Sequence, residues 1–497
     1  MARRCVAFLL ALCVAHTTVL PVWASTADGP GPTAACDNQP TNHVAPPEGA
    51  VTVRPEVDND LQARTSASPP GTAFWLAPGK HTLGEDEFGQ VIPKEGNVYL
   101  GAPGAVLDGR GLNRFAFTQR AENVVIDGLT IQGFVAPQDQ GVVNHDSGDG
   151  WVIENSTIQH NRGAALMAGA GQVMRHNCLR ENGQYGINAY QAGDRISGIV
   201  VEANEIVGNN TDDWETKVPG CGCSGAMKFW AVDGADIRNN WVHHNHGAGL
   251  WADTNNNDFL VEGNLFEDNE AEAVFYEISY NLVLRDNTFR RNTLVQGKRF
   301  AERGDNFPVA TVYLSEAGGE PRVPARTDRI EIHGNVFEDN WAGITLWENA
   351  DRFCNSPANT SSGYCTKLVG AKEECTRPDI TSAPLYDDCR WKTRRVDIQD
   401  NTFRFDPANV GCAGELCGRM AVLSNYGTYP DWSPYQGHGV AEAITFGQDN
   451  RWHGNSYSGP WRFLAHDTSR ALTVEQWRAA PYEQDTCSSF SGAAPAC

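Results

Sequence analysis

The sequence predicts an all-β fold, a solenoid of stacked parallel β-strands, and three observations support this prediction. A phrase that begins and ends with asparagine recurs along residues 155–340 of the 497-residue chain. Segments of alternating apolar and polar residues precede these phrases, and helical periodicity is absent over the same region. Short β-branched strands, glycine turns and a repeat in the twenties are typical of solenoids whose turns stack on one another.

The spacing of the asparagine phrases predicts the turns of the solenoid. Their first residues lie 22, 27, 36, 24, 23 and 48 residues apart, and a late echo follows after a further 66. We interpret the short steps as single turns and the long steps as turns that carry loop insertions. Asparagines at a fixed place in each turn can stack their amides, each donating to the next. The phrases begin at Asn155, Asn177, Asn204, Asn240, Asn264, Asn287 and Asn335, and the echo begins at Asn401.

Two kinds of segment carry a family resemblance. NVVIDGLTIQGF, from Asn123, and the N-x-F-x-x-N phrases resemble the right-handed parallel β-helix repeats of pectate-lyase-like proteins. The resemblance covers the chain from Gly71 to Tyr457, and GTAFWLAPGKHTL and NVYLGAPGAVLDG look like the entry coils of such a helix. It implies a single-stranded right-handed parallel β-helix with loop insertions and a short C-terminal helical cap.

We expect four segments along the chain. Residues 1–24 are predicted to be a secretory signal peptide, because two arginines precede an apolar run and Ala24 fits a small-residue cleavage site. Residues 25–70 are rich in proline, glycine, alanine and threonine and are predicted to be a flexible lead-in. The β-helix is expected over residues 71–465, followed by a cap with a helix and a disulfide tail over residues 466–497.

The end of the chain predicts how the solenoid is closed. LTVEQWRAAPYEQD, from Leu472, indicates a short helix with Thr473 as its N-cap.

After the signal peptide the sequence contains no segment long and apolar enough to span a bilayer. We therefore expect a secreted, extracellular protein, and we expect it to be a monomer.

Cysteine usage agrees with export. Twelve of the fourteen cysteines remain after the signal peptide, and an even number in an exported protein favours disulfides over metal ligands. Cys221 and Cys223 are expected to lie too close together to bridge each other, so that each would tie a loop to another segment. The predicted local pairs are Cys354 with Cys365, Cys375 with Cys389, Cys412 with Cys417, and Cys487 with Cys497.

The charge of the chain excludes some partners. The formal net charge is −22, and no basic run occurs outside the signal peptide. Nucleic acid and anionic membrane surfaces are therefore excluded as expected partners. A polysaccharide remains a fitting substrate, since only the local field in a groove matters for its binding.

The strands that follow the second asparagine of each phrase predict the columns of a candidate site. In these strands inward-facing apolar side chains alternate with outward-facing side chains. A turn of 24 residues then places Asp253 beside Glu277 on one exposed face. One outward column holds His145, Tyr190, Trp230, Asp253 and Glu277. The adjacent column holds Asn188, Lys228, Trp251 and Phe275, and Tyr313 follows on the next turn.

Two insertions are predicted to wall this face. The long step after Asn204 contains Asp212, Asp213, Trp214 and Glu215. A second insertion, from Val295, could contribute Lys298, Arg299 and Arg303 to the opposite wall. Long loops on one side of a solenoid commonly build its binding groove.

The first functional hypothesis is a glycoside hydrolase. Carboxyls on adjacent turns would stand near the roughly 5 Å separation of a retaining pair, with Asp253 and Glu277 as acid and nucleophile or base. The aromatic side chains would offer flat faces to sugar rings. The predicted substrate contacts are Asn188, Tyr190, Trp214, Trp230, Trp251 and Tyr313.

The second hypothesis is a lyase or C5-epimerase acting on a uronate polysaccharide. This chemistry needs a base, here Lys228 or His145, and a cation that neutralises the substrate carboxylate. Asp253, Glu277 and Asp213 could hold Ca²⁺, a hard cation suited to carboxylate oxygens. No other cofactor is indicated.

The third hypothesis is a non-catalytic solenoid that binds glycan or cell wall. Its aromatic side chains would contact the sugar, and its acids would only solvate the face. We favour an enzyme, because a column of unlike polar groups resembles a site more than a solvated surface. The sugar, the linkage and the choice between hydrolase and lyase stay open at this point.

Overall fold

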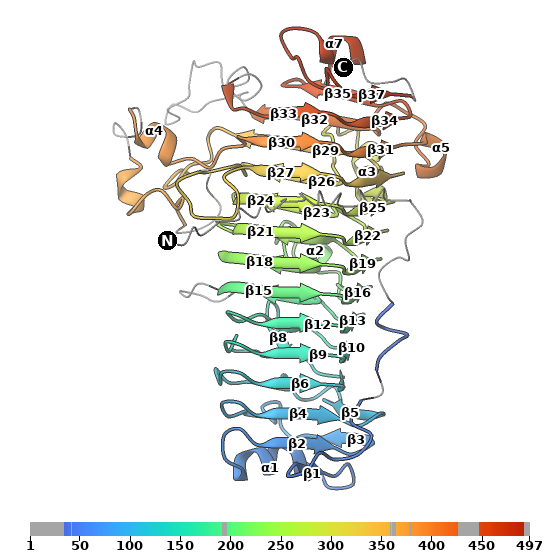
Figure 1. Ribbon diagram of the computed structural model, residues 1–497, viewed down its shortest axis with the longest axis vertical. Coiled ribbons are helices and arrows are strands. Elements are labelled where there is room, and N and C mark those ends of the chain that lie inside the picture. The colour runs from blue at the N-terminus through green and yellow to red at the C-terminus, as the bar shows by residue number, and fades with distance from the viewer. Residues whose placement is uncertain are drawn as a thin grey trace, which may run out of the picture. The chain divides into compact units, whose positions relative to one another are not determined.

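The computed structural model describes residues 34–40, 42–190, 196–357, 359, 364–376, 380, 382–425 and 447–491. All of these residues belong to one unit, Pro32–Cys497. Within this unit the strands form three long sheets in which each strand pairs with the equivalent strand of the preceding and following turn. Figure 1 shows these turns stacked as successive rungs. The predicted parallel β-helix is confirmed.

The first sheet has 13 strands, and all of its pairs are parallel. It alternates apolar side chains, which face the core, with polar ones, as in NDFLVE. Its strands are β1 (Val51–Val53), β2 (Ala73–Leu76), β4 (Val98–Gly101), β6 (Val125–Asp127), β9 (Val152–Glu154), β12 (Val173–Arg175), β15 (Ile196–Glu202), β18 (Val232–Arg238), β21 (Asn257–Glu262), β24 (Tyr280–Arg285), β27 (Ile330–His333), β30 (Val396–Gln399) and β33 (Arg451–His453).

The second sheet also has 13 strands, most of them three residues long, each with its middle side chain in the core. Its strands are β3 (Gly79–Thr82), β5 (Ala105–Asp108), β7 (Thr130–Gln132), β10 (Thr157–Gln159), β13 (Cys178–Arg180), β16 (Glu205–Val207), β19 (Trp241–His243), β22 (Leu265–Glu267), β25 (Thr288–Arg290), β28 (Val336–Glu338), β31 (Thr402–Arg404), β34 (Ser456–Ser458) and β37 (Ser489–Phe490).

The third sheet has 11 strands and carries the predicted site columns. Only its last pair, β35 with β36, is antiparallel. Its strands are β8 (Gly141–Val143), β11 (Ala164–Met167), β14 (Ile187–Ala189), β17 (Gly225–Phe229), β20 (Ala248–Ala252), β23 (Val274–Glu277), β26 (Val312–Ser315), β29 (Ile344–Asn349), β32 (Arg419–Asn425), β35 (Arg462–Ala465) and β36 (Ala471–Leu472).

Helices lie at the ends of the solenoid and in its insertions. In the described residues they are α1 (Asp60–Ala67), α2 (Trp214–Lys217), α3 (Leu294–Glu302), the 3₁₀ helix η1 (Lys372–Glu374), α4 (Leu385–Asp388), α5 (Pro407–Val410) and α7 (Val474–Arg478). The predicted C-terminal helix is α7. The Thr473 side chain accepts a hydrogen bond from the Gln476 N–H, so the predicted N-cap is confirmed. Trp477 of α7 is buried against Phe463 and closes the core at this end.

The start of the solenoid differs from the expectation. Residues 25–70 were expected to form a flexible lead-in, but β1 pairs with β2 in the first sheet. Helix α1 follows β1, and Leu61 is buried in the main apolar cluster. An open end of a solenoid exposes both apolar core and unpaired strand edge, and α1 covers core at this end.

Two asparagine ladders fix the corner between the first two sheets and the corner that follows the second sheet. In the first ladder Asn240 Nδ2 donates to Asn264 Oδ1 at 2.9 Å, and Asn264 donates to Asn287 at 2.9 Å. In the second ladder Asn245 donates to Asn269 at 2.9 Å in the same way. The predicted stacking is confirmed and is double. Asn155 is not part of either ladder, because Ser156 occupies the ladder position of that turn, where its N–H donates to Asn177 Oδ1 at 3.1 Å.

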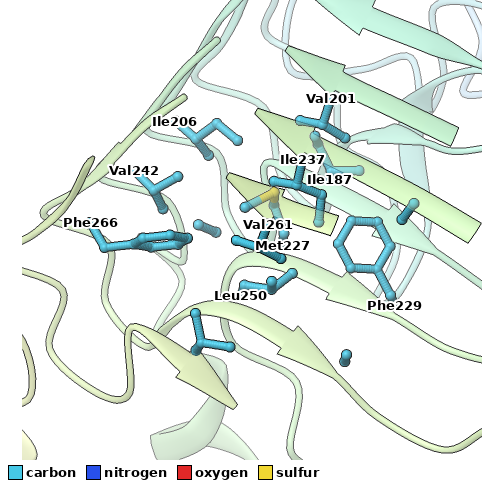
Figure 2. Packing of buried hydrophobic residues seen from close by; sticks show 14 of the residues in the cluster. Ile187, Val201, Ile206, Met227, Phe229, Ile237, Val242, Leu250, Val261 and Phe266 are labelled. Atoms are coloured by element: carbon cyan, nitrogen blue, oxygen red, sulfur yellow. The ribbon is translucent and has the colours of Figure 1, made fainter. Parts of the chain in front are cut away.

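The core is a continuous stack of apolar side chains from the three sheets. Figure 2 shows Ile187, Met227 and Leu250 of the third sheet within this core, and their strands pair in that register. The predicted inward side chains are all fully buried: Leu166, Ala168, Ile187, Ala189, Met227, Phe229, Leu250, Ala252, Val274 and Tyr276. The predicted register of the third sheet is therefore confirmed from β11 to β23.

The disulfides confirm most of the predicted local pairs. Bonds join Cys354 to Cys365, Cys375 to Cys389, and Cys412 to Cys417. A further bond joins Cys36 to Cys178. The predicted pair of Cys487 with Cys497 lies partly outside the described residues.

One expectation about the cysteines was wrong. Cys221 and Cys223 bridge each other, although they are separated by a single residue. Gly222, which stands between them, has φ of +59°, a left-handed conformation that glycine adopts without strain. This glycine permits the tight turn that brings the two sulfurs together.

The ladders predict a large stability effect at a buried asparagine. In Asn264→Ala, the Asn240 amide loses its acceptor and the Ile237 carbonyl loses its donor. Orphaned buried groups cost about 1–3 kcal/mol each, so we expect the free energy of unfolding to fall by about 3 kcal/mol in chemical denaturation. Asn38→Ala, at an exposed site, is the control and should cost less than about 0.5 kcal/mol. Equal losses in the two variants would contradict a stabilising role for the ladder.

Candidate functional site

The outer face of the third sheet brings most of the predicted site residues into register. Lys228 pairs with Trp251, Trp251 with Phe275, and Phe275 with Tyr313. Asn188 pairs with Lys228 on the other side. Because Ala252 pairs with Tyr276, the next positions along the two strands are Asp253 and Glu277. The prediction that these two acids are neighbours on adjacent rungs is confirmed.

The sequence predicted an exposed pair of acids, but both acids are buried. Asp253 is 8% and Glu277 is 9% exposed. The Lys228 ammonium lies 3.1 Å from Asp253 Oδ2, and Arg352 Nη1 lies 2.7 Å from Glu277 Oε1. Arg352 comes from the long connection between β29 and β30, which sequence reasoning had not placed over this face. Each carboxylate therefore has its own cation, which offsets the repulsion between two acids on adjacent rungs.

A third acid extends this charged cluster. Arg352 also lies 3.3 Å from Glu316 Oε2, and Glu316 is fully buried. Burial raises the pKa of Glu316 to about 7, with Arg352 opposing the rise. Burial, and after it the charge of Asp253, raises the pKa of Glu277, again against Arg352.

The aromatic side chains stack on one another along the solenoid. The ring centroids of Trp251 and Phe275 are 4.8 Å apart, and those of Phe275 and Tyr313 are also 4.8 Å apart, with interplanar angles of 28° and 18°. The Lys228 ammonium lies 3.9 Å from the Trp251 ring centre. Both faces of Trp251 are thus covered, so the expected stacking of a sugar on this ring is wrong. The stacked rings present their edges instead.

A groove of about 560 Å³ crosses this face. Its floor includes Trp251, Phe275 and Tyr313, and its two walls come from the predicted insertions. One wall contributes Asp213 and Glu215, beside α2, and the other contributes Arg299 and Arg303, in and after α3. The prediction that these two insertions wall a groove is confirmed.

Two predicted wall residues point elsewhere. Trp214 packs against the small cluster of Ala164, Tyr185 and Cys223. It therefore stabilises the base of the insertion, and its predicted contact with substrate is not supported. Lys298 lies close to Gly411, on the side of α3 that faces α5.

A second hollow, of about 740 Å³, meets the groove at His246 and Glu270, which line both. His246 Nδ1 lies 3.0 Å from Glu270 Oε1, and this hydrogen bond raises the pKa of His246. The second hollow also passes between the two insertions, with Asp212 on one side and Val295 on the other. The two hollows therefore adjoin at His246 and Glu270.

Glu272 is a titratable groove residue that sequence reasoning missed. It lines the groove, and burial raises the pKa of its carboxyl to about 7. Gln296 Nε2, from α3, donates to Glu272 Oε1 at 3.2 Å. By the strand register Glu272 occupies the rung position of Ala248 and Ala310, which are both buried. An acid at a position where neighbouring rungs carry alanine was the available signal.

His145 does not share the column of the acid pair. Val143 pairs with Leu166, which places His145 level with Ala168. Asp146, one residue after His145, is therefore the residue level with Gly169 of that column. The His145 ring stacks on Phe115 at 3.8 Å and lines a separate hollow of about 310 Å³ with Arg120 and Tyr190. Burial lowers the pKa of His145, and the nearby Asp146 carboxylate opposes this.

The other members of the predicted columns lie near this separate hollow. Tyr190 is 41% exposed and makes an edge contact with Trp230, at 5.9 Å between centroids. Trp230 makes a second edge contact with Tyr364. Asn188 is buried, and its amide donates to the Asp139 carbonyl at 2.9 Å. In the order of the sheet, β11, β14 and β17 separate β8, which ends beside His145, from β20, which precedes Asp253.

The residues predicted to hold Ca²⁺ do not fit a cation site. Asp253 and Glu277 already bind Lys228 and Arg352, and Asp213 lies on the groove wall. Within the described part of the chain, no group of three or more His, Cys, Asp or Glu side chains is arranged to hold a metal ion. A cation here would have to displace two ammonium or guanidinium partners.

The match to a family model agrees with the architecture. Residues 118–310 match the family model of the right handed beta helix region, and the chain contains a right-handed parallel β-helix. Among solved structures, the catalytic unit of a thermostable alpha-1,3-glucanase from Streptomyces thermodiastaticus is 13% identical over 86% of this chain and 72% of its own, with a TM-score of 0.48. The A-module of a mannuronan C-5 epimerase from Azotobacter vinelandii is 13% identical over 71% of this chain and 94% of its own, with a TM-score of 0.42. No curated protein sequence matches the chain.

A helix that spans a bilayer must be about 20 residues long and predominantly apolar. Of those in the described residues, none combines the length and the apolar character of a membrane-spanning segment.

The raised pKa of Glu272 predicts a pH-dependent stability. Its folded value of about 7 lies above the usual 4.5, so its contribution to stability is complete below pH 4.5 and is lost as the pH rises through about 7. We therefore expect wild type to lose stability relative to Glu272→Gln across this range, as measured by denaturant unfolding at several pH values. Glu316, which titrates in the same range, is present in both proteins and cancels. If the free energies of unfolding of the two proteins changed in parallel with pH, the raised pKa of Glu272 would be contradicted.

Proposed function

We propose that the protein is a secreted, polysaccharide-active enzyme and that the groove between α2 and α3 binds and hydrolyses a glycan. The observation that carries this proposal is Glu272, a carboxyl on the groove lining whose pKa burial raises to about 7. A carboxyl that stays protonated near neutral pH in a groove is suited to act as a general acid.

The surroundings of Glu272 support a polymeric sugar as the substrate. The groove continues into the second hollow at His246 and Glu270, so that a chain longer than one residue can be accommodated. Its walls offer the carboxylates of Asp213 and Glu215 and the guanidinium groups of Arg299 and Arg303. Charged groups of both signs can hydrogen-bond the many hydroxyls of a sugar.

The proposed reaction uses two carboxyls in different states. Glu272 gives its proton to the glycosidic oxygen as the bond to the anomeric carbon breaks. Water adds to that carbon, and its proton passes to Glu270, which the hydrogen bond with His246 holds at the junction of the two hollows. A proton then returns from Glu270 to Glu272 through solvent, so that the products are two shorter glycans and the net change is the addition of one water.

We expect the hydrolysis to depend on Glu272 and on pH. Incubation with a panel of polysaccharides should release reducing ends, and Glu272→Gln should reduce the rate at least about 100-fold. The rate should fall as the pH rises through about 7, because the acid then loses its proton. Glu262→Gln, on the first sheet and paired with Arg285, is the matched control and should retain activity. Binding without turnover in wild type would instead support a non-catalytic glycan-binding solenoid.

A second candidate function rests on the separate hollow. Burial lowers the pKa of His145, which favours the neutral imidazole, and His145 lines this hollow with Arg120 and Tyr190. A neutral imidazole can remove the proton next to a uronate carboxylate, and an arginine can neutralise that carboxylate. Loss of the leaving sugar oxygen then gives an unsaturated uronate, whereas return of the proton on the opposite face gives a C5-epimer.

This candidate predicts a different product. Uronate polymers should then yield products with the absorbance of an unsaturated uronate, and His145→Gln should lower their formation at least about 100-fold. His333→Gln, on the first sheet, is the control. Reducing ends without unsaturation, unaffected by His145→Gln, would exclude this candidate and leave the hydrolase.

A further inference from the structure

We propose that Asp253 and Glu277 are positioning residues, which together with Lys228 and Arg352 dock the loop Cys221–Gly222–Cys223 and Trp251 as one wall unit of the groove. This inference rests on the proposed function of the groove for its effect on substrate. Its structural part, the docking of the loop, stands on contacts alone.

The loop lies directly against the indole. Gly222 and Trp251 both line the groove. A Cβ atom added to Gly222 would lie 2.6 Å from Trp251 Cη2, so only the bare main chain of a glycine fits at this contact. The disulfide between Cys221 and Cys223 closes the turn. The position of Gly222 therefore sets where this wall stands.

Lys228 joins the loop, the ring and the first acid. Its ammonium donates a hydrogen bond to the Gly222 carbonyl, lies 3.9 Å from the Trp251 ring centre and lies 3.1 Å from Asp253 Oδ2. An ammonium over an indole face, partly removed from water, is an attractive cation–π arrangement. Asp253 thus acts through Lys228, because it holds the ammonium at the point where it reaches both partners.

Glu277 fixes the ring from its edge. Trp251 Nε1 donates to Glu277 Oε2 at 3.1 Å, and Arg352 binds the other carboxylate oxygen at 2.7 Å. Phe275, which pairs with Trp251 on the next strand, stacks on the indole at 4.8 Å between ring centroids. The indole is therefore held at its edge by Glu277 and at its faces by Phe275 and Lys228.

The location of the acids separates positioning from catalysis. Among the described residues that line the groove are Trp251 and Gly222, but neither Asp253 nor Glu277. Both acids are nearly buried, and each is engaged by a cation. A group without access to substrate influences binding through the residues that it holds, which changes KM more than kcat.

The test compares Lys228→Met with Lys228→Arg, using hydrogen–deuterium exchange and kinetics on the full chain. Lys228→Met should increase exchange of the amides in residues 219–225, but not in β4 and β5. It should raise KM about tenfold with kcat within about twofold. Lys228→Arg, which keeps the charge, should restore part of both values. Unchanged exchange in residues 219–225 would overturn the docking.

Two further variants cover the remaining outcomes. If Lys228→Met does not fold, Cys221→Ser with Cys223→Ser frees the loop without altering the charged cluster, and the same rise in exchange and KM is expected. Asp253→Asn should resemble Lys228→Met, and a loss of kcat of about 100-fold at constant KM would instead make Asp253 catalytic and overturn the proposal. If no polysaccharide is cleaved, the proposed function fails, while the exchange measurement still decides the docking.

Discussion

The side-chain amide ladders are the interaction on which the rest of this structure depends. At two corners of the solenoid, from Asn177 to Asn455 and from Asn161 to Asn340, an asparagine donates to its equivalent on the next turn and also to backbone carbonyls, as Asn264 does toward Asn287 and Ile237. A shift by one residue would break these bonds and would turn every side chain of a strand from the core to the surface. The ladders therefore fix the register of all three sheets, and through it the neighbours of each outward side chain.

The groove arises where the regular stack is interrupted. Between the ladder positions Asn209 and Asn245 the chain leaves the solenoid to form α2 and the disulfide loop, and after Asn292 it leaves again to form α3. Both insertions stand over the third sheet and enclose the ends of β20 and β23. Because the ladder continues on either side of each insertion, the walls are anchored to a rigid base, which suits a binding site.

Burial decides the chemistry of the acids on this face. Asp253 and Glu277 are each engaged by a cation, whereas Glu272 has an amide partner and a raised pKa. Removing a carboxyl from water disfavours its charge unless a cation or donors compensate. Similar acids within one turn therefore differ in their state: Asp253 and Glu277 are paired with cations, and the pKa of Glu272 is raised.

Much of this could be predicted from the sequence, since the information is local and repetitive. The alternation of the strands, the recurrent asparagines and the 24-residue step established the parallel solenoid, its inward side chains and the pairing of Asp253 with Glu277. The two long steps between asparagine phrases likewise predicted the insertions that wall the groove. These features follow from periods and spacings, which a sequence displays directly.

The tertiary structure alone decided what surrounds those residues. Arg352 reaches Glu277 across 75 residues of sequence, and no spacing predicted that contact. The stacking of Trp251 on Phe275 hid the ring faces that a sugar would need, and a glycine let Cys221 bridge Cys223. Repeats determine which residues stand side by side, whereas burial, charge pairing and access depend on how irregular segments fold back over them. For that physical reason the fold could be predicted from the sequence, whereas the burial and the charge pairing of each acid could not.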